Sequence, residues 1–274
     1  CNKFISRTKR YKIIMLLAAE NYNEIKKTFN TEFRKVLDEY SEFKVFMYDV
    51  FLHGSAYVVG GFLRNIINKQ PYRDLDIIID LQHDLLLDKL NQYNLFCEIN
   101  RHGGIKLKLD SFYIDIWSIE NNWAFKNNLV KQNDEYILEN IATGSFYNFD
   151  ALVINVHTKN LNVKYYNEFV KNRELDILQR KESYKVLNPT IEANILRAFY
   201  LKKLYDIKFS DNTVDYLKRR LLYLDDNYQN HINRLIEVKA KYEKYSNVLN
   251  ESILIEYCTE LLNSAKDNNL KLKM

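Results

Sequence analysis

The chain of 274 residues contains 47% hydrophobic and 28% charged residues, proportions that are typical of globular proteins and exclude a largely disordered or collagen-like chain. The formal net charge of +4 is unevenly distributed, with −1 over residues 1–150 and +5 over residues 151–274. A mildly basic rear half is compatible with a polyanionic partner but does not require one.

The beginning of the chain shows no predicted membrane span or secretory signal. The longest apolar run there, 13–19, is shorter than the roughly 18 residues of a span, and no small-residue cleavage site follows it. The widely separated Cys1, Cys97 and Cys258 provide neither zinc-site spacing nor a disulfide framework. We therefore expect a cytoplasmic protein without membrane contact. A first residue other than Met predicts a trimmed or truncated chain.

In chain order, the front half is predicted to begin with one or two helices over 8–40, where apolar residues recur at helical spacing. A further helix is predicted over 62–69. Between and after these helices lie short apolar or alternating runs beside turn residues, and Asp110-Ser111 is a plausible hairpin turn. The predicted strands are 56–59, 74–79, 105–109, 112–119 and 151–157.

The rear half is predicted to be helical, because no glycine follows Gly144 and the last 130 residues contain one proline. Asn188-Pro189 resembles a helix start, with Asn as the cap and Pro in the first turn. The predicted helices are 189–208, 211–224, 228–247 and 250–265. The expected domains are an N-terminal helical segment over 1–44, an α/β head over 45–160 and a helical domain over 161–274.

Residues 57–80 contain the pattern that is most informative about chemistry. A predicted strand leads into Gly60-Gly61 at the start of a helix, where glycine lets the backbone approach a phosphate and free N–H groups favour an anion. Arg64, one turn further, can add charge-assisted hydrogen bonds. Asp74 and Asp76 lie two apart on a strand, so both carboxylates share one face and suit Mg²⁺.

A third carboxylate, Asp115, alternates with apolar residues on the predicted strand 112–119, where an unused charge would be costly. It would complete a site for two Mg²⁺ ions, with Mn²⁺ as a substitute, that activates an attacking hydroxyl and stabilises a leaving pyrophosphate. Asp80 lies beyond the strand end and is not included. Arg73 either contacts phosphate or faces solvent. Lys106 is expected on a solvated strand face.

The spacing G-G-x-x-R, nine residues, D-x-D occurs here as Gly60, Gly61, Arg64, Asp74 and Asp76. It resembles the signature of class II CCA-adding enzymes and bacterial poly(A) polymerases, within the polymerase-β-like nucleotidyltransferase superfamily. The resemblance implies an α+β nucleotidyltransferase head, a small mixed sheet flanked by helices, followed by an all-helical C-terminal domain. It also implies that the glycines and the arginine hold a nucleoside triphosphate and that the aspartates hold the metals.

By the same resemblance, Asp115 would draw the proton from the acceptor hydroxyl. Residues 149–154 lie where the family contacts the ribose, and 195–198 match its L-R-A helix. Asn65 replaces a family Asp, and 144–146 replace Arg-Arg-Asp; the Leu-Gly-Arg before the aspartates and the base-reading Glu-Asp-x-x-Arg are absent. The resemblance thus implies a preserved catalytic centre with another nucleotide or acceptor, as in toxin or antiviral-defence nucleotidyltransferases.

The first hypothesis is a template-independent nucleotidyltransferase that transfers NMP from an NTP or dNTP to a hydroxyl and releases pyrophosphate. The acceptor would be a nucleic-acid 3′ end, such as that of tRNA, or an oligonucleotide made by the enzyme itself. One alternative is nucleotidylation of a protein side-chain hydroxyl, and another is a non-catalytic nucleotide-sensing or RNA-binding module. The intact Asp74/Asp76 pair argues against the latter. A regulatory protein partner stays open.

Overall fold

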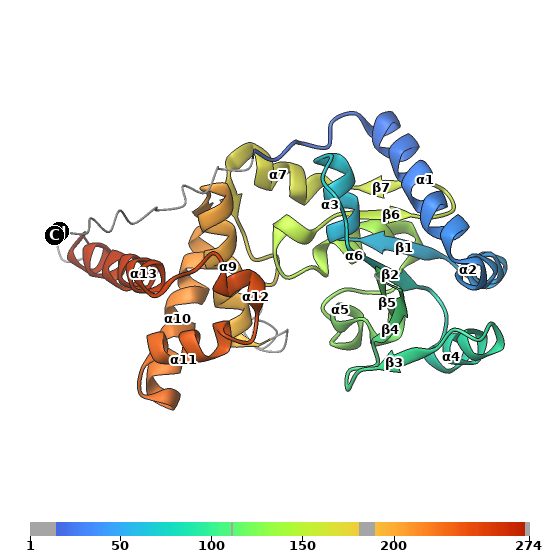
Figure 1. Ribbon diagram of the computed structural model, residues 1–274. Helices are drawn as coiled ribbons and strands as arrows, with labels where there is room; N and C mark the ends of the chain where they lie inside the picture. Colours follow the sequence, from blue (N-terminus) through green and yellow to red (C-terminus); the bar gives the residue numbers. More distant parts are fainter. Residues whose placement is uncertain (1–14, 111, 181–189, 272–274) are drawn as a thin grey trace, which may run out of the picture. The chain divides into compact units, whose positions relative to one another are not determined.

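The computed structural model describes residues 15–110, 112–180 and 190–271 (Figure 1). These residues form two compact units. The first contains the described residues of 17–180, and the second contains those of 190–271 together with Met15 and Leu16. The domain limits expected at 44 and 160 both fall inside the first unit, so residues 17–44 and 161–180 lie in the same compact unit as residues 45–160.

A seven-stranded sheet forms the centre of the first unit. In spatial order its strands are β3 (Cys97–Ile99), β4 (Ile105–Leu109), β5 (Phe112–Ser118), β2 (Asp74–Ile79), β1 (Ala56–Val59), β6 (Val153–Asn155) and β7 (Leu161–Asn162). β2 and β5 run parallel, and the other neighbouring strands are antiparallel. The predicted mixed sheet is confirmed. The short edge strands β3 and β7 were not predicted.

The two faces of β2 and β5 carry different side chains, because successive residues of a strand point to opposite faces. One face is apolar and fully buried, and consists of Leu75, Ile77, Ile79, Ile114 and Ile116. The opposite face carries Asp74, Asp76 and Asp115 at one end. At its other end Tyr57 and Ile78 pack with residues of α6 (Ile137–Thr143). One end of this face is therefore filled, whereas the carboxylates lie at the other.

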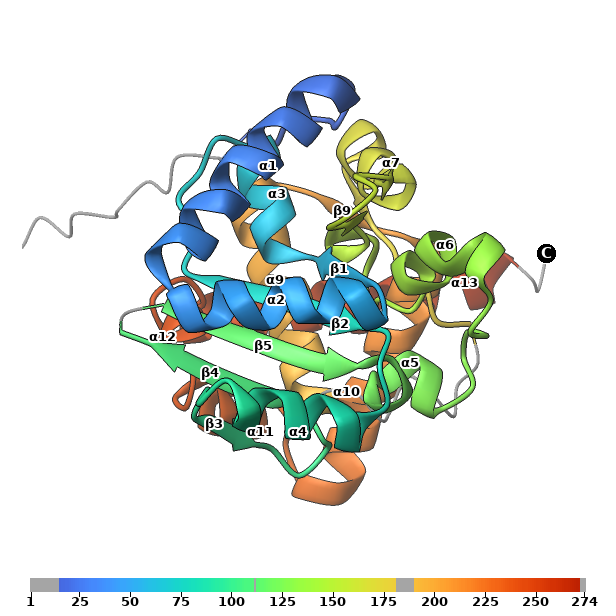
Figure 2. The same ribbon diagram turned by 90° about the vertical axis from the view of Figure 1, so that its right-hand side faces the viewer.

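Helices flank the sheet. α2 (Ser41–His53) and α4 (His83–Gln92) lie in front of the strands in Figure 2, and Lys89 of α4 donates a 2.6 Å hydrogen bond to Asp49 of α2. The other elements of this unit are α1 (Tyr22–Glu39), α3 (Gly61–Ile67), α5 (Trp123–Lys126), α7 (Lys164–Asn172), β8 (Glu174–Leu175) and the 3₁₀ turns η1 (Ile119–Asn121), η2 (Asp134–Tyr136) and η3 (Asn148–Asp150). α1 begins later than predicted because the side chain of Asn21 caps it by accepting from the backbone N–H of Glu24.

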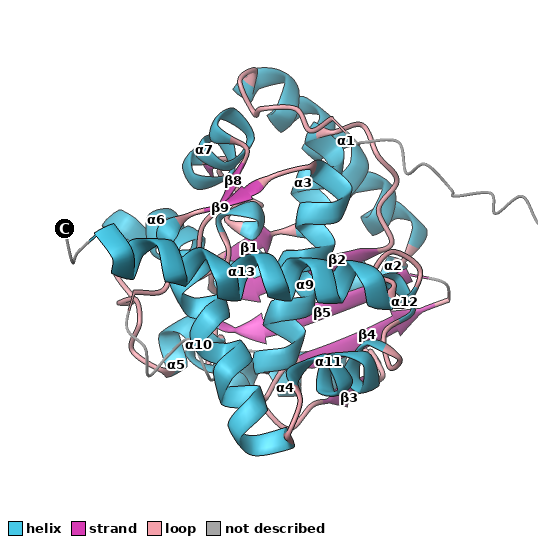
Figure 3. Ribbon diagram, turned by 90° about the vertical axis from the view of Figure 1, so that its left-hand side faces the viewer, coloured by secondary structure: helices cyan, strands magenta, loops and turns pink. Residues whose placement is uncertain are grey.

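The second unit is helical, as Figure 3 shows in cyan. It consists of α9 (Ile191–Tyr205), β9 (Lys208–Phe209), α10 (Asp211–Tyr228), α11 (His231–Lys239), α12 (Glu243–Ser246) and α13 (Glu251–Lys271). The side chains of Thr190, Ser210 and Asn230 cap three of these helices by accepting backbone N–H groups. The predicted helical C-terminal region is confirmed. No helix among the described residues combines the length and apolar composition needed to cross a bilayer.

The single helix predicted over 228–247 is wrong. Gln229 adopts a left-handed conformation (φ 66°) at the end of α10, and Tyr242 is extended between α11 and α12. Neither break contains Gly or Pro, so helix propensity does not reveal it. The predicted start at Asn188-Pro189 lies outside the described residues, as does the second residue of the predicted turn after Asp110.

Candidate active site

Asp76 and Asp115 face each other across the parallel strands β2 and β5, where they are direct partners in the register. Asp74 precedes Asp76 by two residues, so its side chain shares the same face. The parallel pairing of two strands that are far apart in sequence therefore gathers the three aspartates that the sequence analysis singled out. All three are partly buried.

These carboxylates repel one another in a partly desolvated setting. Burial, followed by the charges of Asp74, Asp115 and Asp150, raises the pKa of Asp76 to about 7, and Arg64 opposes this shift. Burial also raises the pKa of Asp115, which the charge of a nearby lysine opposes and that of Asp74 reinforces. The cluster therefore holds more negative charge than its own cations neutralise, an arrangement that favours a divalent cation.

A glycine turn between β1 and α3 borders these carboxylates. The backbone N–H of Gly60 donates to the carbonyl of Leu152 over 3.1 Å, and Gly60 has φ 62° and ψ −119°, a conformation available mainly to glycine. A Cβ on Gly61 would lie 3.9 Å from Oδ1 of Asp74 and 3.7 Å from Nη2 of Arg64. The missing side chain at Gly61 thus leaves the backbone open directly beside the acidic cluster.

Replacing Gly60 or Gly61 with alanine is expected to affect different properties, namely the stability of the fold and the binding of a ligand. Gly61→Ala meets only ordinary van der Waals contacts, so it should fold normally. By the role that the family resemblance implies for this turn, it should weaken the binding of a nucleoside triphosphate by about tenfold or more, which is about 1.4 kcal/mol. Gly60→Ala should lower the free energy of unfolding by about 1–3 kcal/mol, because alanine is strained at this φ and ψ. Thermal unfolding and titration with a non-hydrolysable ATP analogue check both. If the folded Gly61→Ala protein bound the analogue with wild-type affinity, this turn would have no role in triphosphate binding.

Arg64 has a partner that the sequence analysis did not assign to the site. Its Nη1 donates to Oδ1 of Asp150 over 2.8 Å, and its guanidinium carbon lies 4.1 Å from the centre of the Phe149 ring. Only the family resemblance pointed to this segment, because the two residues are 86 positions apart. A guanidinium has five N–H donors, so Arg64 can be oriented by Asp150 and still donate to a phosphate.

Two other basic residues lie at the edge of the cluster. Arg73 is 81% exposed, with Nη2 4.0 Å from Oδ2 of Asp74. Lys106 is the cross-strand partner of Asp115, and its Nζ lies 3.8 Å from Oδ1 of that carboxylate. Lys106 is exposed, as expected for a solvated strand face, and the structure adds its position beside Asp115. The register of the hairpin β4–β5 would have revealed this pairing.

The donor set fits Mg²⁺ by its chemistry, since hard carboxylate oxygens surround a point of excess negative charge. Among residues 15–110, 112–180 and 190–271, no group of three or more His, Cys, Asp or Glu side chains lies close enough together to hold a metal ion without rearrangement. The raised pKa of Asp76 and the open backbone at Gly61 are the observations that support the fit. Asp74, Asp76 and Asp115 are the residues that could hold the ion.

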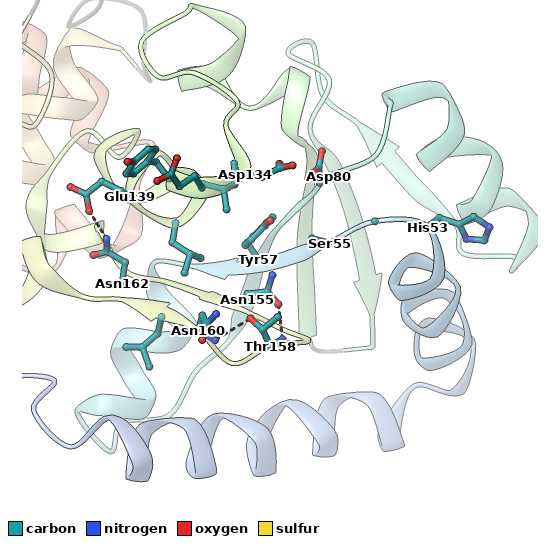
Figure 4. Close-up of a pocket in the computed structure, with 16 residues that line it drawn as sticks. His53, Ser55, Tyr57, Asp80, Asp134, Glu139, Asn155, Thr158, Asn160 and Asn162 are labelled. Carbon is teal, nitrogen blue, oxygen red and sulfur yellow. Dashed lines mark hydrogen bonds between the residues drawn. The ribbon is translucent and has the colours of Figure 1, made fainter.

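A separate cavity of about 650 Å³ lies at the other end of the same strands (Figure 4). It opens beside Ser55 and Tyr57 at the start of β1 and Asp80 after β2, whereas Gly60 and Asp74 lie at the opposite strand ends. Its lining includes the carboxylates of Asp80, Asp134, Glu135 and Glu139. No Lys or Arg of the described residues lines this cavity, although Nζ of Lys164 lies 4.0 Å from Oε1 of Glu139. Its excess of carboxylates disfavours a triphosphate, so its size does not make it a nucleotide site.

No family model and no curated protein matches the chain by sequence. Solved structures match it by fold. A CCA-adding enzyme in apo form I is 18% identical, with a TM-score of 0.59 over 87% of this chain and 54% of that one. A tRNA nucleotidyltransferase complexed with a primer tRNA and an incoming ATP analogue is 17% identical, with a TM-score of 0.53 over 80% and 62%.

The Thermotoga maritima CCA-adding enzyme complexed with tRNA is 17% identical, with a TM-score of 0.54 over 77% of this chain and 47% of that one. The chain thus spans about half to three fifths of the length of these structures. At this identity the likeness establishes the fold, and the predicted nucleotidyltransferase head with a helical C-terminal region is confirmed at that level.

Proposed function

We propose that this chain is a template-independent nucleotidyltransferase that transfers NMP from a nucleoside triphosphate to the 3′ hydroxyl of an RNA. The hydroxyl oxygen forms a bond to the α-phosphorus, the bond from that phosphorus to the bridging oxygen of the β-phosphate breaks, and pyrophosphate leaves. The hydroxyl proton passes to a carboxylate oxygen of Asp115. The nucleotide identity is not part of the proposal.

One observation carries the proposal, namely the register that sets Asp76 opposite Asp115 beside the open backbone of Gly61. The carboxylate cluster and the triphosphate-binding turn must adjoin for transfer to occur, because the α-phosphorus lies between the triphosphate tail and the acceptor hydroxyl. A structural role explains neither the crowding of three carboxylates on a central pair of strands nor the glycine conformation next to them.

In this proposal the uncharged and basic residues bind the triphosphate, and the acidic residues bind the metal ions. Gly60 and Gly61 would present backbone to the triphosphate, and Arg64, oriented by Asp150, would donate hydrogen bonds to its oxygens. Arg73 is exposed at the rim and can reach the same oxygens. Asp74, Asp76 and Asp115 would hold two Mg²⁺ ions, or Mn²⁺, whose chemistry when bound is to polarise phosphoryl oxygens and stabilise the charge on pyrophosphate.

The choice of RNA as the acceptor rests on the structures of similar fold, several of which are complexes with tRNA or with CTP or ATP. It also agrees with the net charge of +5 over residues 151–274. The absent base-reading element leaves CCA addition itself outside the proposal. A free oligonucleotide or a protein hydroxyl uses the same chemistry and is distinguished by the product.

The full chain with Mg²⁺ and each α-³²P-labelled NTP or dNTP in turn, with a mixture of tRNA, tests the function. We expect label in the RNA and release of unlabelled pyrophosphate. The matched control is the same tRNA after periodate oxidation of its 3′ end, which should accept no label. Label on protein would show that the acceptor is a protein side chain and not RNA. Nucleotide binding without any incorporation would contradict the proposed enzymatic activity and favour a nucleotide sensor.

A further inference from the structure

α2 carries apolar side chains on both its inner and its outer face. Its inner side chains, Phe43, Phe46, Met47 and Val50, are fully buried. Its outer face nevertheless exposes Val45 (50%), Tyr48 (53%) and Leu52 (81%), which recur at intervals of three and four residues and so form one stripe. On a surface helix the face opposite the core usually carries polar or charged side chains. The described residues leave this outer face uncovered.

A groove lies beside this stripe, and we call it the α1–α2 groove. It has a volume of about 500 Å³ and is bounded by α1, α2 and the turn between β6 and β7. Phe33 and Leu37 of α1, Phe51 and Leu52 of α2 and Val156 line it with apolar surface. None of the residues assigned to the candidate active site lines it, so its role is independent of the proposed function.

The polar rim of the α1–α2 groove is basic. Arg34, His157 and Lys159 line it, and no Asp or Glu does. Within the described part of the chain neither Arg34 nor Lys159 forms an ion pair with a carboxylate. Burial and the neighbouring Arg34 lower the pKa of Lys159, as expected for two cations without an anion between them. Nζ of Lys159 donates to the backbone carbonyl of Val156 and lies 5.5 Å from the centre of the Phe29 ring, whereas Arg34 is exposed. The groove thus combines an apolar floor with a positively charged rim.

We propose that the α1–α2 groove binds an acidic amphipathic helix of a partner protein. The apolar side chains of that helix would enter the groove along the stripe from Tyr48 to Leu52, and its carboxylates would face Arg34 and Lys159. This is the general mode in which a helix lays its apolar face into a hydrophobic groove, with anchors at i, i+3, i+4 and i+7. Charge complementarity then selects acidic helices over basic ones.

Other occupants fit the groove less well. A second copy of this chain, related by two-fold symmetry, would bring the same basic rim close to itself. The chain's own residues 1–14 contain five Lys or Arg and no Asp or Glu, so they would be repelled. Single-stranded RNA would meet the basic rim and could stack a base on Tyr48, but Leu37, Leu52 and Val156 add no further stacking surface for successive bases.

A selection of displayed 16-residue peptides on the full chain tests the proposal. The recovered peptides should be acidic with apolar residues at helical spacing. A synthetic representative should lose affinity by about tenfold or more with Leu52→Asp, because a charge then enters the apolar contact. Phe96→Asp is the matched control, since Phe96 is a similarly exposed apolar residue (93%) outside the groove, and it should bind as wild type.

Reversing the charges of the groove rim tests the electrostatic contribution to peptide binding. Arg34→Glu combined with Lys159→Glu should weaken the acidic peptide about tenfold and favour the same peptide with Lys in place of Glu. Recovery of no peptides, of basic peptides, or of peptides insensitive to Leu52→Asp overturns the proposal. So does equal binding of a synthetic 1–14 peptide, binding of an oligouridylate that Leu52→Asp abolishes, or a dimer in sedimentation that Leu52→Asp dissociates. Unchanged melting temperatures of the variants show that folding is not the cause.

Discussion

Replacing Asp76 or Asp115 with asparagine is expected to reduce nucleotidyl transfer by about 1,000-fold or more, the range seen when a general base or a key electrostatic group is removed. Asparagine keeps the shape of the side chain but can neither hold a divalent cation with full charge nor accept the acceptor proton. Because both residues are only partly buried and crowded by like charges, the folded state should persist. The loss should appear in kcat with bound nucleotide retained.

The matched control for this pair is Asp110→Asn. Asp110 directly follows β4, five residues before Asp115 in the sequence, but adopts the left-handed conformation of a turn (φ 50°), which asparagine also tolerates. It should keep wild-type transfer. Incorporation of labelled nucleotide into RNA under single-turnover conditions measures all three variants. If Asp115→Asn kept more than a tenth of the wild-type activity, Asp115 could not have the proposed role as the proton acceptor.

The ion-free protein is expected to become less stable as the pH rises toward 8, and Asp76→Asn should remove part of that loss. The pKa of Asp76 is about 7 in the folded chain against 3.8 for the ordinary group. A carboxyl whose folded pKa is raised favours the protonated form, so its contribution is intact below pH 4 and lost as the pH climbs through 7. The full loss corresponds to about 4 kcal/mol.

Thermal unfolding in EDTA at several pH values checks this prediction. Between pH 5.5 and 8 the Asp76→Asn protein should gain about 2 kcal/mol relative to the wild type, or several degrees in Tm. Adding Mg²⁺ at pH 8 should stabilise the wild type and leave Asp76→Asn nearly unchanged, because binding to the folded state alone raises stability. A wild type that responds to neither pH in this range nor Mg²⁺ would contradict the crowded-carboxylate account.

Local patterns in the sequence were sufficient for several strands. The strands 56–59, 74–79 and 105–109 have the limits predicted from alternation and turn residues, because a side-chain period of two and a glycine turn are local properties. α2 was missed, since apolar residues on its outer face as well as its inner face obscure the helical period. β3 and β7 were missed because three and two residues hold too little pattern.

Local patterns alone were enough to match two glycines, an arginine and two aspartates to the spacing of a family signature, and to predict a helical rear half. Only the tertiary structure decided that Asp115 faces Asp76, that Asp150 binds Arg64 and that the outer face of α2 meets a basic rim. Each of these contacts joins residues from distant parts of the chain. Pairing of strands and packing of helices set such distances, and no local spacing encodes them.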